Sequence, residues 1–391
     1  MRGMSLRGRL QQVLSSWRRK QRQYRSLNSI TLNKAHALHN VQLLRGLHPG
    51  FHIIPVLKAN AYGHGLREMA RILNDTPCDL LAVDGYFEAG QIRFISNHRL
   101  LVLGYILPEN VPVLDTRRCS FVVQDLDVLA AFGTLHRPVK IHLEINTGMN
   151  RLGIAPGEVA VYLAALQKYP LLELEGVMTH LADADNELDD TYTHQQVRVF
   201  DDCVRDIQQA GFNPAYVHIA QTAGSTKAHS DYANALRLGI GLYGINPLHS
   251  SDARHDALEG LKPVLALTST IVKVIDLKKG DKVSYNGTFT ALRAMRIGVL
   301  PLGYYEGVPR EFGNRGFVMH GDTALPIIGR VCMNHTMIDL GVTGTRVGDK
   351  VSVFADDANR PNAIIRVCNQ YGLFPYEVLT RLSGSVRRAV L

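Results

Sequence analysis

Short aliphatic or β-branched runs alternate with amphipathic helical segments from about residue 27 to residue 245. Helical spacing is clear in segments such as Gly65–Asn74, Val159–Tyr169 and Tyr192–Ala210. The runs between the helical segments predict eight strands: Phe51–Leu57, Leu80–Val83, Leu100–Leu103, Phe121–Val123, Val139–Ile145, Leu172–Met178, Ala215–Ile219 and Ala235–Ile240. This alternation favours an α/β fold, a parallel (β/α)8 TIM barrel. A doubly wound open sheet is the alternative, but no GxGxxG motif follows the first strand.

The pattern changes after about Pro247 to short strand-like runs separated by Gly, Asp and Asn turns. These runs are Pro263–Ile275, Lys282–Thr290, Met295–Pro301, Phe317–His320, Ala324–Val331, Met337–Leu340 and Lys350–Ala355. They predict a C-terminal, mainly antiparallel β domain. We therefore expect a basic N-terminal extension (1–26), a barrel (27–250) and a C-terminal β domain (251–391).

The net charge of +8 comes from one end of the chain. Residues 1–25 contain eight of the 43 basic residues and no acid, so the remainder carries as many bases as its 35 acids. The basicity therefore predicts a solvated extension and not a nucleic-acid-binding face on the fold. Within this extension, the spacing of the apolar residues is that of an amphipathic helix and not of a secretory signal: Leu6, Leu10, Val13, Leu14 and Trp17.

Two further features limit the class of protein. No stretch approaches the roughly 20 apolar residues of a membrane span. The five cysteines are scattered without a CxxC pair, so neither a disulfide framework nor a zinc or other metal site is indicated. These features are typical of a cytoplasmic enzyme in a reducing compartment.

The segment VLKANAYGHG, residues 56–65, places Lys58 at the end of the first predicted strand. In a barrel, the carboxyl ends of the strands face the active site. A lysine flanked there by apolar residues is partly desolvated, which makes its neutral amine available for Schiff-base chemistry. For the lysine alone, a surface position with the charged end in water is the ordinary alternative.

The whole segment resembles the cofactor-lysine motif of the alanine racemase family, amino-acid racemases with a barrel fold that depend on pyridoxal 5'-phosphate. The resemblance implies that Lys58 bonds to this cofactor and then acts as base or acid on one face of the substrate α-carbon. It also implies that Tyr62 helps to hold the phosphate.

Further motifs extend the resemblance through the barrel. HLEINTGMNRLG (142–153) and VMTHLA (177–182) are similar to the segments that carry an arginine near the cofactor's phenolic oxygen and the substrate, here Arg151, and a histidine beside its ring, here His180. VHIAQTAGS (217–225) is similar to the phosphate-binding turn with Thr222. RLGIGLYG (237–244) resembles the segment that faces the pyridine nitrogen and the phosphate, here Arg237, Gly239 and Ile240.

Arg237 has a chemical consequence of its own. An arginine only donates and keeps its proton, so a pyridine nitrogen facing it stays unprotonated. The cofactor is then a weaker electron sink, which disfavours transamination and leaves α-proton exchange.

Inverting an α-carbon requires acids or bases on both of its faces. KVSYNGTFTA (282–291) resembles the family motif with the opposite-face tyrosine, here Tyr285, which belongs to the partner subunit of a homodimer. A phenol needs nearby positive charge to act as a base, and His180 with Arg237 are the candidates. LPLGYYEGVPR (300–310) and GRVCMNHTMID (329–339) resemble motifs with a tyrosine and a methionine at the phosphate and substrate carboxylate, here Tyr304 and Met333.

Three positions depart from the family pattern. Glu144 stands where many members have a carbamylated lysine, and we expect it to pair with Arg151. Asn334 replaces an aspartate, and Gly384 replaces an aromatic residue near the pocket. Room at Gly384 makes serine or a longer amino acid an alternative to alanine as substrate.

The sequence thus predicts an isomerase, an alanine racemase that supplies D-alanine for peptidoglycan. A serine or broad-specificity racemase is the first alternative. A barrel-fold decarboxylase and a non-catalytic cofactor-binding protein are the others.

Overall fold

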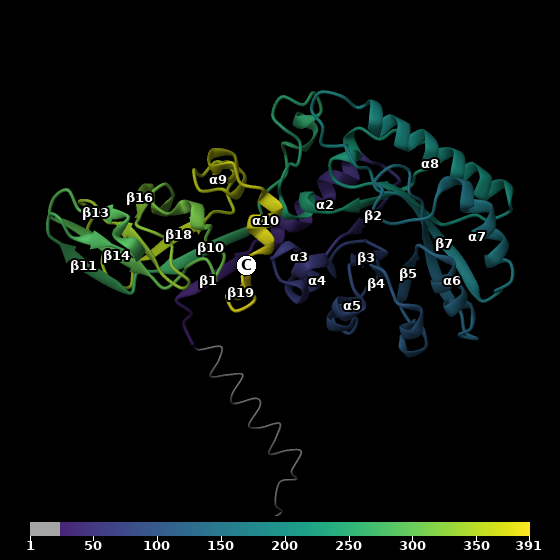
Figure 1. Ribbon diagram of the computed structural model, residues 1–391, viewed down its shortest axis with the longest axis horizontal. Coiled ribbons are helices and arrows are strands. Elements are labelled where there is room, and N and C mark those ends of the chain that lie inside the picture. The colour runs from purple at the N-terminus through teal and green to yellow at the C-terminus, as the bar shows by residue number, and fades with distance from the viewer. Residues whose placement is uncertain (1–23) are drawn as a thin grey trace, which may run out of the picture.

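The computed structural model describes residues 24–391 of the chain. The predicted helix of the basic extension lies outside these residues. Two bodies lie side by side, a helix-surrounded barrel and a β-rich domain (Figure 1). Within residues 24–391, no helix is long and apolar enough to cross a membrane.

The barrel contains eight parallel strands in the order β2-β9-β8-β7-β6-β5-β4-β3. The strands are β2 (His52–Pro55), β3 (Leu80–Val83), β4 (Arg99–Val102), β5 (Cys119–Val123), β6 (Val139–Glu144), β7 (Leu172–Met178), β8 (Tyr216–Ala220) and β9 (Ala235–Leu238). The ring closes between its first and last members, where Val56 pairs with Ala82 and the Leu57 amide donates to the Ala82 carbonyl at 2.7 Å. The predicted TIM barrel is confirmed, and every predicted barrel strand is present with ends shifted by at most two residues.

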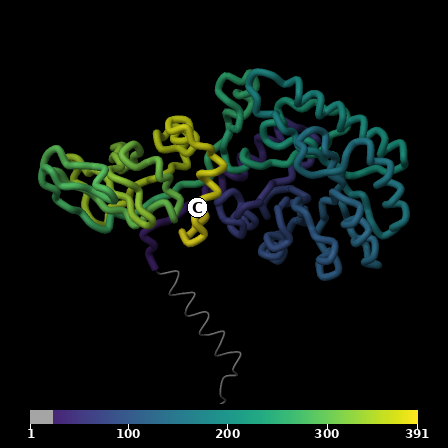
Figure 2. The backbone as a smooth tube through the Cα atoms, in the orientation of Figure 1, coloured from purple at the N-terminus to yellow at the C-terminus, as the bar shows by residue number. Residues whose placement is uncertain are grey.

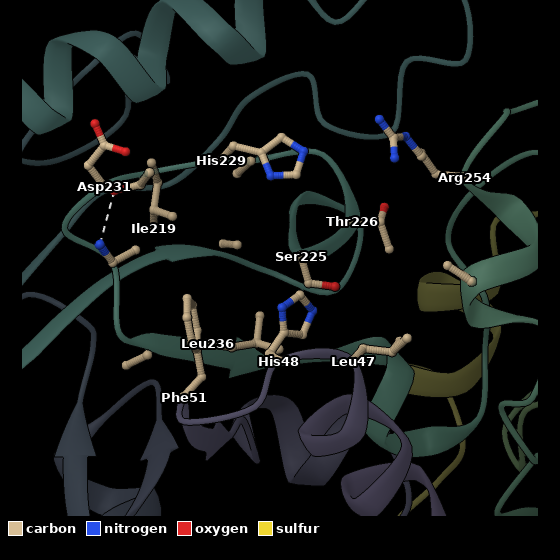
Figure 3. Close-up of a pocket in the computed structure, with 16 residues that line it drawn as sticks. Leu47, His48, Phe51, Ile219, Ser225, Thr226, His229, Asp231, Leu236 and Arg254 are labelled. Carbon is tan, nitrogen blue, oxygen red and sulfur yellow. Dashed lines mark hydrogen bonds between the residues drawn. The ribbon is translucent and has the colours of Figure 1, made fainter.

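Helices cover most of the outer barrel surface (Figure 1). The main ones are α2 (Lys34–Leu47), α4 (Leu66–Leu73), α5 (Tyr86–Ile92), α6 (Leu126–Gly133), α7 (Val159–Leu166) and α8 (Thr191–Gln209). Between β8 and β9 there is only a single 3-10 turn, η3 (Gly224–Thr226). A side cavity of about 420 Å³ lies there, with Ile219, Leu236 and Phe51 among its apolar walls and His48 and His229 among its polar ones (Figure 3).

The second domain is built on a sheet in the order β11-β14-β17-β16-β15-β18-β10-β1-β19. Its strands are β1 (Asn28–Leu32), β10 (Leu265–Thr270), β11 (Lys273–Leu277), β14 (Met295–Leu300), β15 (Phe317–His320), β16 (Thr323–Ile328), β17 (Thr336–Asp339), β18 (Lys350–Phe354) and β19 (Arg387–Val390). Every pairing is antiparallel except that of β1 with β19. The expected antiparallel character is confirmed, and α9 (Ile364–Tyr371) and α10 (Pro375–Thr380) complete the domain.

Strand β1 belongs to this second sheet, although its residues fall in the segment 27–250 expected to form the barrel. It pairs with β10 on one side and β19 on the other, and Figure 2 shows the first described residues running beside the last ones. Ile30 and Leu32 are fully buried. An apolar alternation predicts a strand but not its partner, so the sequence did not separate β1 from the barrel.

Two predicted runs are each divided in the structure. Pro263–Ile275 forms β10 and β11. Lys282–Thr290 forms the short strands β12 (Lys282–Val283) and β13 (Phe289–Thr290) around a 3-10 turn at Tyr285–Gly287. Ser284 and Asn286 have φ values of 66° and 62° there, and such left-handed conformations of non-glycine residues are not visible in a hydrophobic pattern.

A buried ion cluster fixes the connection after β8. The Lys227 ammonium lies 2.6 Å from Asp252 Oδ2 and 3.0 Å from Asp190 Oδ1, and it also donates to the Asn186 carbonyl at 2.6 Å. The side chains of Lys227 and Asp252 are only 2% and 3% exposed. Removing one member of such a cluster leaves a buried charge uncompensated.

We expect Lys227→Met to lower the free energy of unfolding by about 3 kcal/mol, because the buried charge of Asp252 then loses the cation that compensates it. Urea unfolding followed by circular dichroism measures this loss. Lys168→Met, at an exposed lysine with no ion pair within 4.0 Å in residues 24–391, serves as the control and is expected to change stability by less than about 0.5 kcal/mol. Equal effects of the two substitutions would contradict the role of the cluster.

Candidate functional site

A cavity of about 350 Å³ opens at the carboxyl ends of the barrel strands. Seven residues singled out from the sequence line it: Lys58, Tyr62, Glu144, Arg151, His180, Arg237 and Gly239. Asp84, Tyr105 and Gln221 are also part of its wall. The barrel topology explains this gathering, because each of these residues lies near the end of a barrel strand or in the segment that follows one.

The segment after β2 forms a left-handed helical turn. Ala59, Asn60, Ala61 and Tyr62 all have φ values between 50° and 55°, and Gly63 follows at 77°. This conformation costs roughly 1–2 kcal/mol per residue for L-amino acids, so the surrounding structure must stabilise it. The turn directs Lys58 and Tyr62 into one cavity although they are only four residues apart.

The second domain supports this turn. A Cβ atom on Gly63 would lie 1.9 Å from the Leu379 carbonyl oxygen of α10, so only glycine allows this approach. Arg388 of β19 donates to the Gly63 carbonyl through Nη2 at 2.7 Å. The conformation of the lysine-bearing turn therefore depends on residues more than 300 positions away in the sequence.

Arg237, on β9, is held by backbone carbonyls. Its Nη1 donates to the His218 carbonyl at 2.7 Å, and its Nη2 donates to the carbonyls of Thr179 at 2.6 Å and Ile219 at 3.1 Å. Burial lowers the pKa of Arg237 to about 10, so the guanidinium remains a cation and a donor at neutral pH.

His180 follows β7 and accepts a hydrogen bond at Nδ1 from Arg237 Nη2, at 3.2 Å. Because arginine only donates, the proton of the neutral His180 ring is on Nε2. Burial and the charges of Arg237, Arg151 and Lys58 lower the pKa of His180 to about 3. His180 and Arg237 were both candidates to supply positive charge near the tyrosine phenol, but only Arg237 is charged at neutral pH.

Glu144 does not form the expected ion pair with Arg151. Its carboxylate, at the end of β6, is buried and accepts from Gln124 Nε2 at 2.8 Å. Gln124 follows the adjacent strand β5, so its amide reaches the carboxylate directly. No ion pair within 4.0 Å joins Glu144 to Arg151, which is exposed on the loop that follows β6.

A cradle of small residues and hydroxyl groups adjoins the end of the cavity that Tyr62, Gln221 and Gly239 line. The Gly241 amide donates to Thr222 Oγ1 at 3.1 Å. Cβ atoms added to Gly239 and Gly241 would lie 3.1 Å from the Tyr62 hydroxyl and 2.6 Å from Thr222 Cγ2. Ile240 is buried between these glycines, and the buried Gln221 Oε1 has no hydrogen-bond partner among residues 24–391.

Tyr62 is protonated in this cradle. Burial, together with the nearby Asp84, raises its pKa to about 12. A protonated phenol, backbone amides and a threonine hydroxyl are the donors that a phosphate monoester requires. Across residues 24–391, no three His, Cys, Asp or Glu side chains are placed to hold a metal ion.

Five predicted site residues are not among those that line this cavity: Thr222 and Ile240 of the barrel, and three residues of the second domain. Tyr285, Tyr304 and Met333 belong to the second domain and are 69%, 42% and 55% exposed. Tyr285 lies between β12 and β13, and Figure 1 shows β13 at the end of the second domain away from the barrel. Within one chain, Lys58 and Tyr285 therefore do not share a cavity.

Several polar residues of the site were not singled out from the sequence. Gln124 is a single amide with no motif around it, and Gln221 lies within the motif VHIAQTAGS without having been assigned a role. His218, His142 and Glu175 lie inside strands. Both histidines fall within quoted motifs, whereas for Glu175 a polar residue among buried positions is the only signal.

Two family matches cover most of the chain. The N-terminal domain of alanine racemases matches residues 32–247, and the C-terminal domain matches residues 264–390. The chain belongs to the alanine racemase family. The prediction from the motifs is thereby confirmed at the level of the family.

Individual relatives agree with this assignment. The chain is 31% identical to an alanine racemase of Methanococcus maripaludis, over 90% of this chain and 95% of that protein. It is 33% identical to one of Geobacter sulfurreducens, over 90% and 94%. Among solved structures, alanine racemases of Clostridium difficile and Bacillus anthracis superpose with TM-scores of 0.86 and 0.85 at 27% and 28% identity, each covering 94% of this chain and 96% of the other.

Buried neutral histidines make the stability of the fold dependent on pH. Burial lowers the pKa of His64 and His180 to about 3, and it also lowers the pKa values of His142 and His218. In the unfolded chain these rings accept protons below about pH 6.5. The unfolded state therefore binds more protons than the native state in this range, and stability falls as the pH drops below 6.5.

His64→Phe isolates one of these contributions. The His64 ring packs 4.4 Å from the ring of Tyr243, which a phenyl group can also do. Between pH 6 and pH 4 we expect the variant to lose stability less steeply than the parent, by about 1.4 kcal/mol per pH unit. Urea unfolding at several pH values measures the slope, and parallel slopes would contradict the assignment of His64 as neutral.

Proposed function

We propose that this protein interconverts L- and D-alanine with pyridoxal 5'-phosphate bound at the barrel mouth. The observation that supports this most directly is the convergence of the Lys58 amine, the Arg237 guanidinium and the Tyr62 cradle on one cavity. The cofactor's chemistry when bound is to accept the electrons released when the substrate α-carbon loses its proton. We infer that Tyr62, Thr222, Gly239 and Ile240 hold its phosphate.

The protein's own residues would direct the reaction. Lys58 removes or returns the α-proton on one face of the substrate through its amine nitrogen. Arg237 keeps its proton, so a ring nitrogen bound against it would stay unprotonated, which would restrict the chemistry to α-proton exchange. Arg151, exposed at the rim of the cavity, would bind the substrate carboxylate together with the Met333 amide.

A homodimer would supply the acid–base group on the second face of the substrate α-carbon. Tyr285, Tyr304 and Met333 are exposed side chains of the second domain, outside the cavity of their own chain. Exposed aromatic and methionine side chains are typical of a surface that a partner covers. In the proposed dimer the partner's Tyr285 phenol faces Lys58 across the substrate, and Tyr304 approaches the phosphate.

Tyr285→Phe tests the second acid–base group. We expect kcat to fall by about 10²–10⁴, because a positioned general acid or base contributes that much. The visible absorbance of bound cofactor should remain. Tyr169→Phe, outside the cavity, is the matched control, and unchanged turnover of Tyr285→Phe would favour a one-base mechanism.

A mixture of two inactive variants tests whether sites are shared. Equal amounts of Lys58→Ala and Tyr285→Phe, unfolded and refolded together, should recover roughly a quarter of parental activity, because half of the dimers are mixed and half of their sites are intact. If both groups of a site came from one chain, the mixed dimers would contain no intact site. Failure to recover activity in verified mixed dimers would therefore reject the shared site.

Substrate choice depends on the space around the substrate side chain. Gly384 is exposed, and a Cβ atom placed on it meets nothing within 4 Å, so the position offers open space. Asn334, the other departure, donates to Glu306 Oε1 at 2.7 Å and so holds the loop that carries Met333. Serine is therefore the second candidate substrate.

We expect Gly384→Tyr to lower kcat/KM for serine at least tenfold more than for alanine, because pocket contacts discriminate by about 1–3 kcal/mol per added group. Chiral chromatography of a panel of L-amino acids gives both ratios. Serine turned over better than alanine by the parent protein would replace alanine as the substrate.

The cellular role follows from the product. We propose that the protein supplies D-alanine for cell-wall synthesis. All five cysteines are unpaired, which supports a reducing compartment and hence the cytoplasm as the proposed location.

A further inference from the structure

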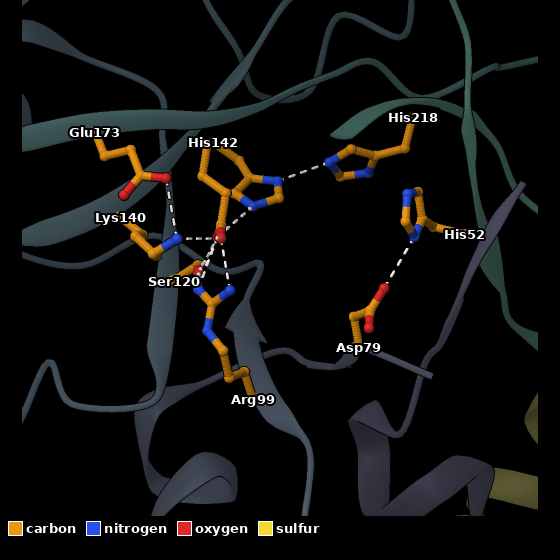
Figure 4. Close-up of polar contacts among 9 residues, drawn as sticks. His52, Asp79, Arg99, Ser120, Lys140, His142, Glu173 and His218 are labelled. Carbon is orange, nitrogen blue, oxygen red and sulfur yellow. Dashed lines mark hydrogen bonds and ion pairs between the residues drawn. The ribbon is translucent and has the colours of Figure 1, made fainter. Parts of the chain in front are cut away.

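A line of buried polar side chains runs from Arg237 into the barrel interior, and Figure 4 shows it from His218 onward. Arg237 Nη1 lies 3.0 Å from His218 Nδ1, and His218 Nε2 lies 2.8 Å from His142 Nδ1. His142 Nε2 then lies 3.3 Å from Glu175 Oε2. All four side chains are at most 3% exposed, so water cannot substitute for any of these contacts.

The two ends of this line determine the direction of every hydrogen bond in it. Arg237 can only donate, so His218 Nδ1 accepts and the His218 proton is on Nε2. That proton points at His142 Nδ1, which must therefore accept. His142 then carries its proton on Nε2 and donates it to the carboxylate of Glu175.

Both histidines are neutral in this arrangement. Burial lowers their pKa values, and the positive charge of Arg237 acts in the same direction on each. A charged imidazolium would present two donors and would oppose the donor groups of Arg237. Neutral rings with a single tautomer each are the state that satisfies all contacts.

Glu175, on β7, is held as an anion by other groups. Arg99 donates to its two carboxylate oxygens at 2.6 and 2.9 Å, Ser120 donates at 2.5 Å and Lys140 at 2.9 Å. Burial acts to raise the pKa of Glu175, but the hydrogen bonds from His142, Arg99, Ser120 and Lys140 together hold it well below its usual range. A carboxylate in this state accepts and cannot donate.

The backbone around His142 is adapted to this line. A Cβ atom on Gly176 would lie 2.2 Å from His142 Nδ1, so glycine at this position makes room for the ring. Tyr216 stacks on the other side, with ring centroids 5.8 Å apart and an interplanar angle of 18°.

Arg237 has no counter-ion in direct contact: among residues 24–391 no carboxylate lies within 4.0 Å of its guanidinium, and the charge of Glu144 favours the cation only from a longer distance. Its positive charge is buried, and the line of oriented N–H groups ends on the negative charge of Glu175. Each N–H dipole in the line has its negative end toward Arg237, which stabilises the cation.

We propose that Glu175 and His142 are positioning residues for Arg237: the carboxylate at the inner end fixes one hydrogen-bond direction along the line and thereby holds the guanidinium in place at the cavity. The inference rests on the proposed function for the role of Arg237 at the cavity. The directions of the hydrogen bonds do not depend on that function. Replacing Glu175 by glutamine gives the inner end a group that both accepts and donates. The reversed line, which directs an N–H of His218 at Arg237, then becomes accessible.

The first experiment uses the unmodified protein. With ¹⁵N-labelled histidine, the imidazole spectrum at neutral pH should show His142 and His218 with protonated Nε2 and unprotonated Nδ1, with or without cofactor. His142→Gln and His218→Gln assign the two signals. Protonated Nδ1 in either ring would overturn the proposal, whatever activity the protein has.

The second experiment compares Glu175→Gln with Glu173→Gln. Glu173 lies on the same strand and pairs with the same lysine at 3.0 Å, but it is outside the line. We expect Glu175→Gln to change the tautomer signals of both histidines and to shift the absorbance maximum of the bound cofactor, and to lower kcat/KM at least tenfold. Glu173→Gln should leave the tautomer signals and the absorbance maximum unchanged, and kcat/KM within twofold of the parent.

The outcomes separate the two proposals. Unchanged histidine signals in folded Glu175→Gln would overturn the positioning role. If Glu175→Gln does not fold, the tautomers of the unmodified protein still decide whether the line has the proposed direction. Absence of cofactor binding by the parent protein would reject the proposed function and leave the tautomer test unaffected.

Discussion

A buried arginine with no ion-pair partner in the described part of the chain is the constraint around which this barrel is arranged. Arg237 lies inside the fold, where an uncompensated charge is costly. Its hydrogen-bond capacity is met by carbonyls at the ends of β7 and β8 and by two histidines. The positions of β7 and β8 relative to β9 therefore determine whether the Arg237 guanidinium is held as a hydrogen-bond donor at the cavity.

The sequence predicted the barrel and the gathering of its site residues well, for one physical reason. Strands buried on both faces form nearly continuous apolar runs, and parallel strands bring their carboxyl ends to one edge. Residues placed after those runs, such as Lys58, His180 and Arg237, then share a cavity. The order of the strands alone brings these residues together, whatever the packing of the other side chains.

Other features could not be predicted because they depend on contacts between distant residues. Glu144 bonds to Gln124 and not to Arg151, which is a matter of side-chain reach between neighbouring strands. The left-handed turn after Lys58 is stabilised by α10 and β19, which lie at the far end of the chain. The line from Arg237 to Glu175 requires the exact spatial order of four strands. The placement of Tyr285 opposite Lys58 depends on a second chain and remains a prediction.

The position of β1 has a consequence for how the molecule is assembled. The first described strand belongs to the second sheet, the chain then forms the whole barrel, and it returns to the sheet from β10 onward, with β10 and β19 as the neighbours of β1. While a ribosome is still completing the barrel, β1 has neither neighbour, and its apolar residues Ile30 and Leu32 stay uncovered. Unpaired strands of this kind attract other chains. A nascent chain of this protein is thus exposed to misassociation until β10 has been added, and one edge of β1 stays open until β19 follows.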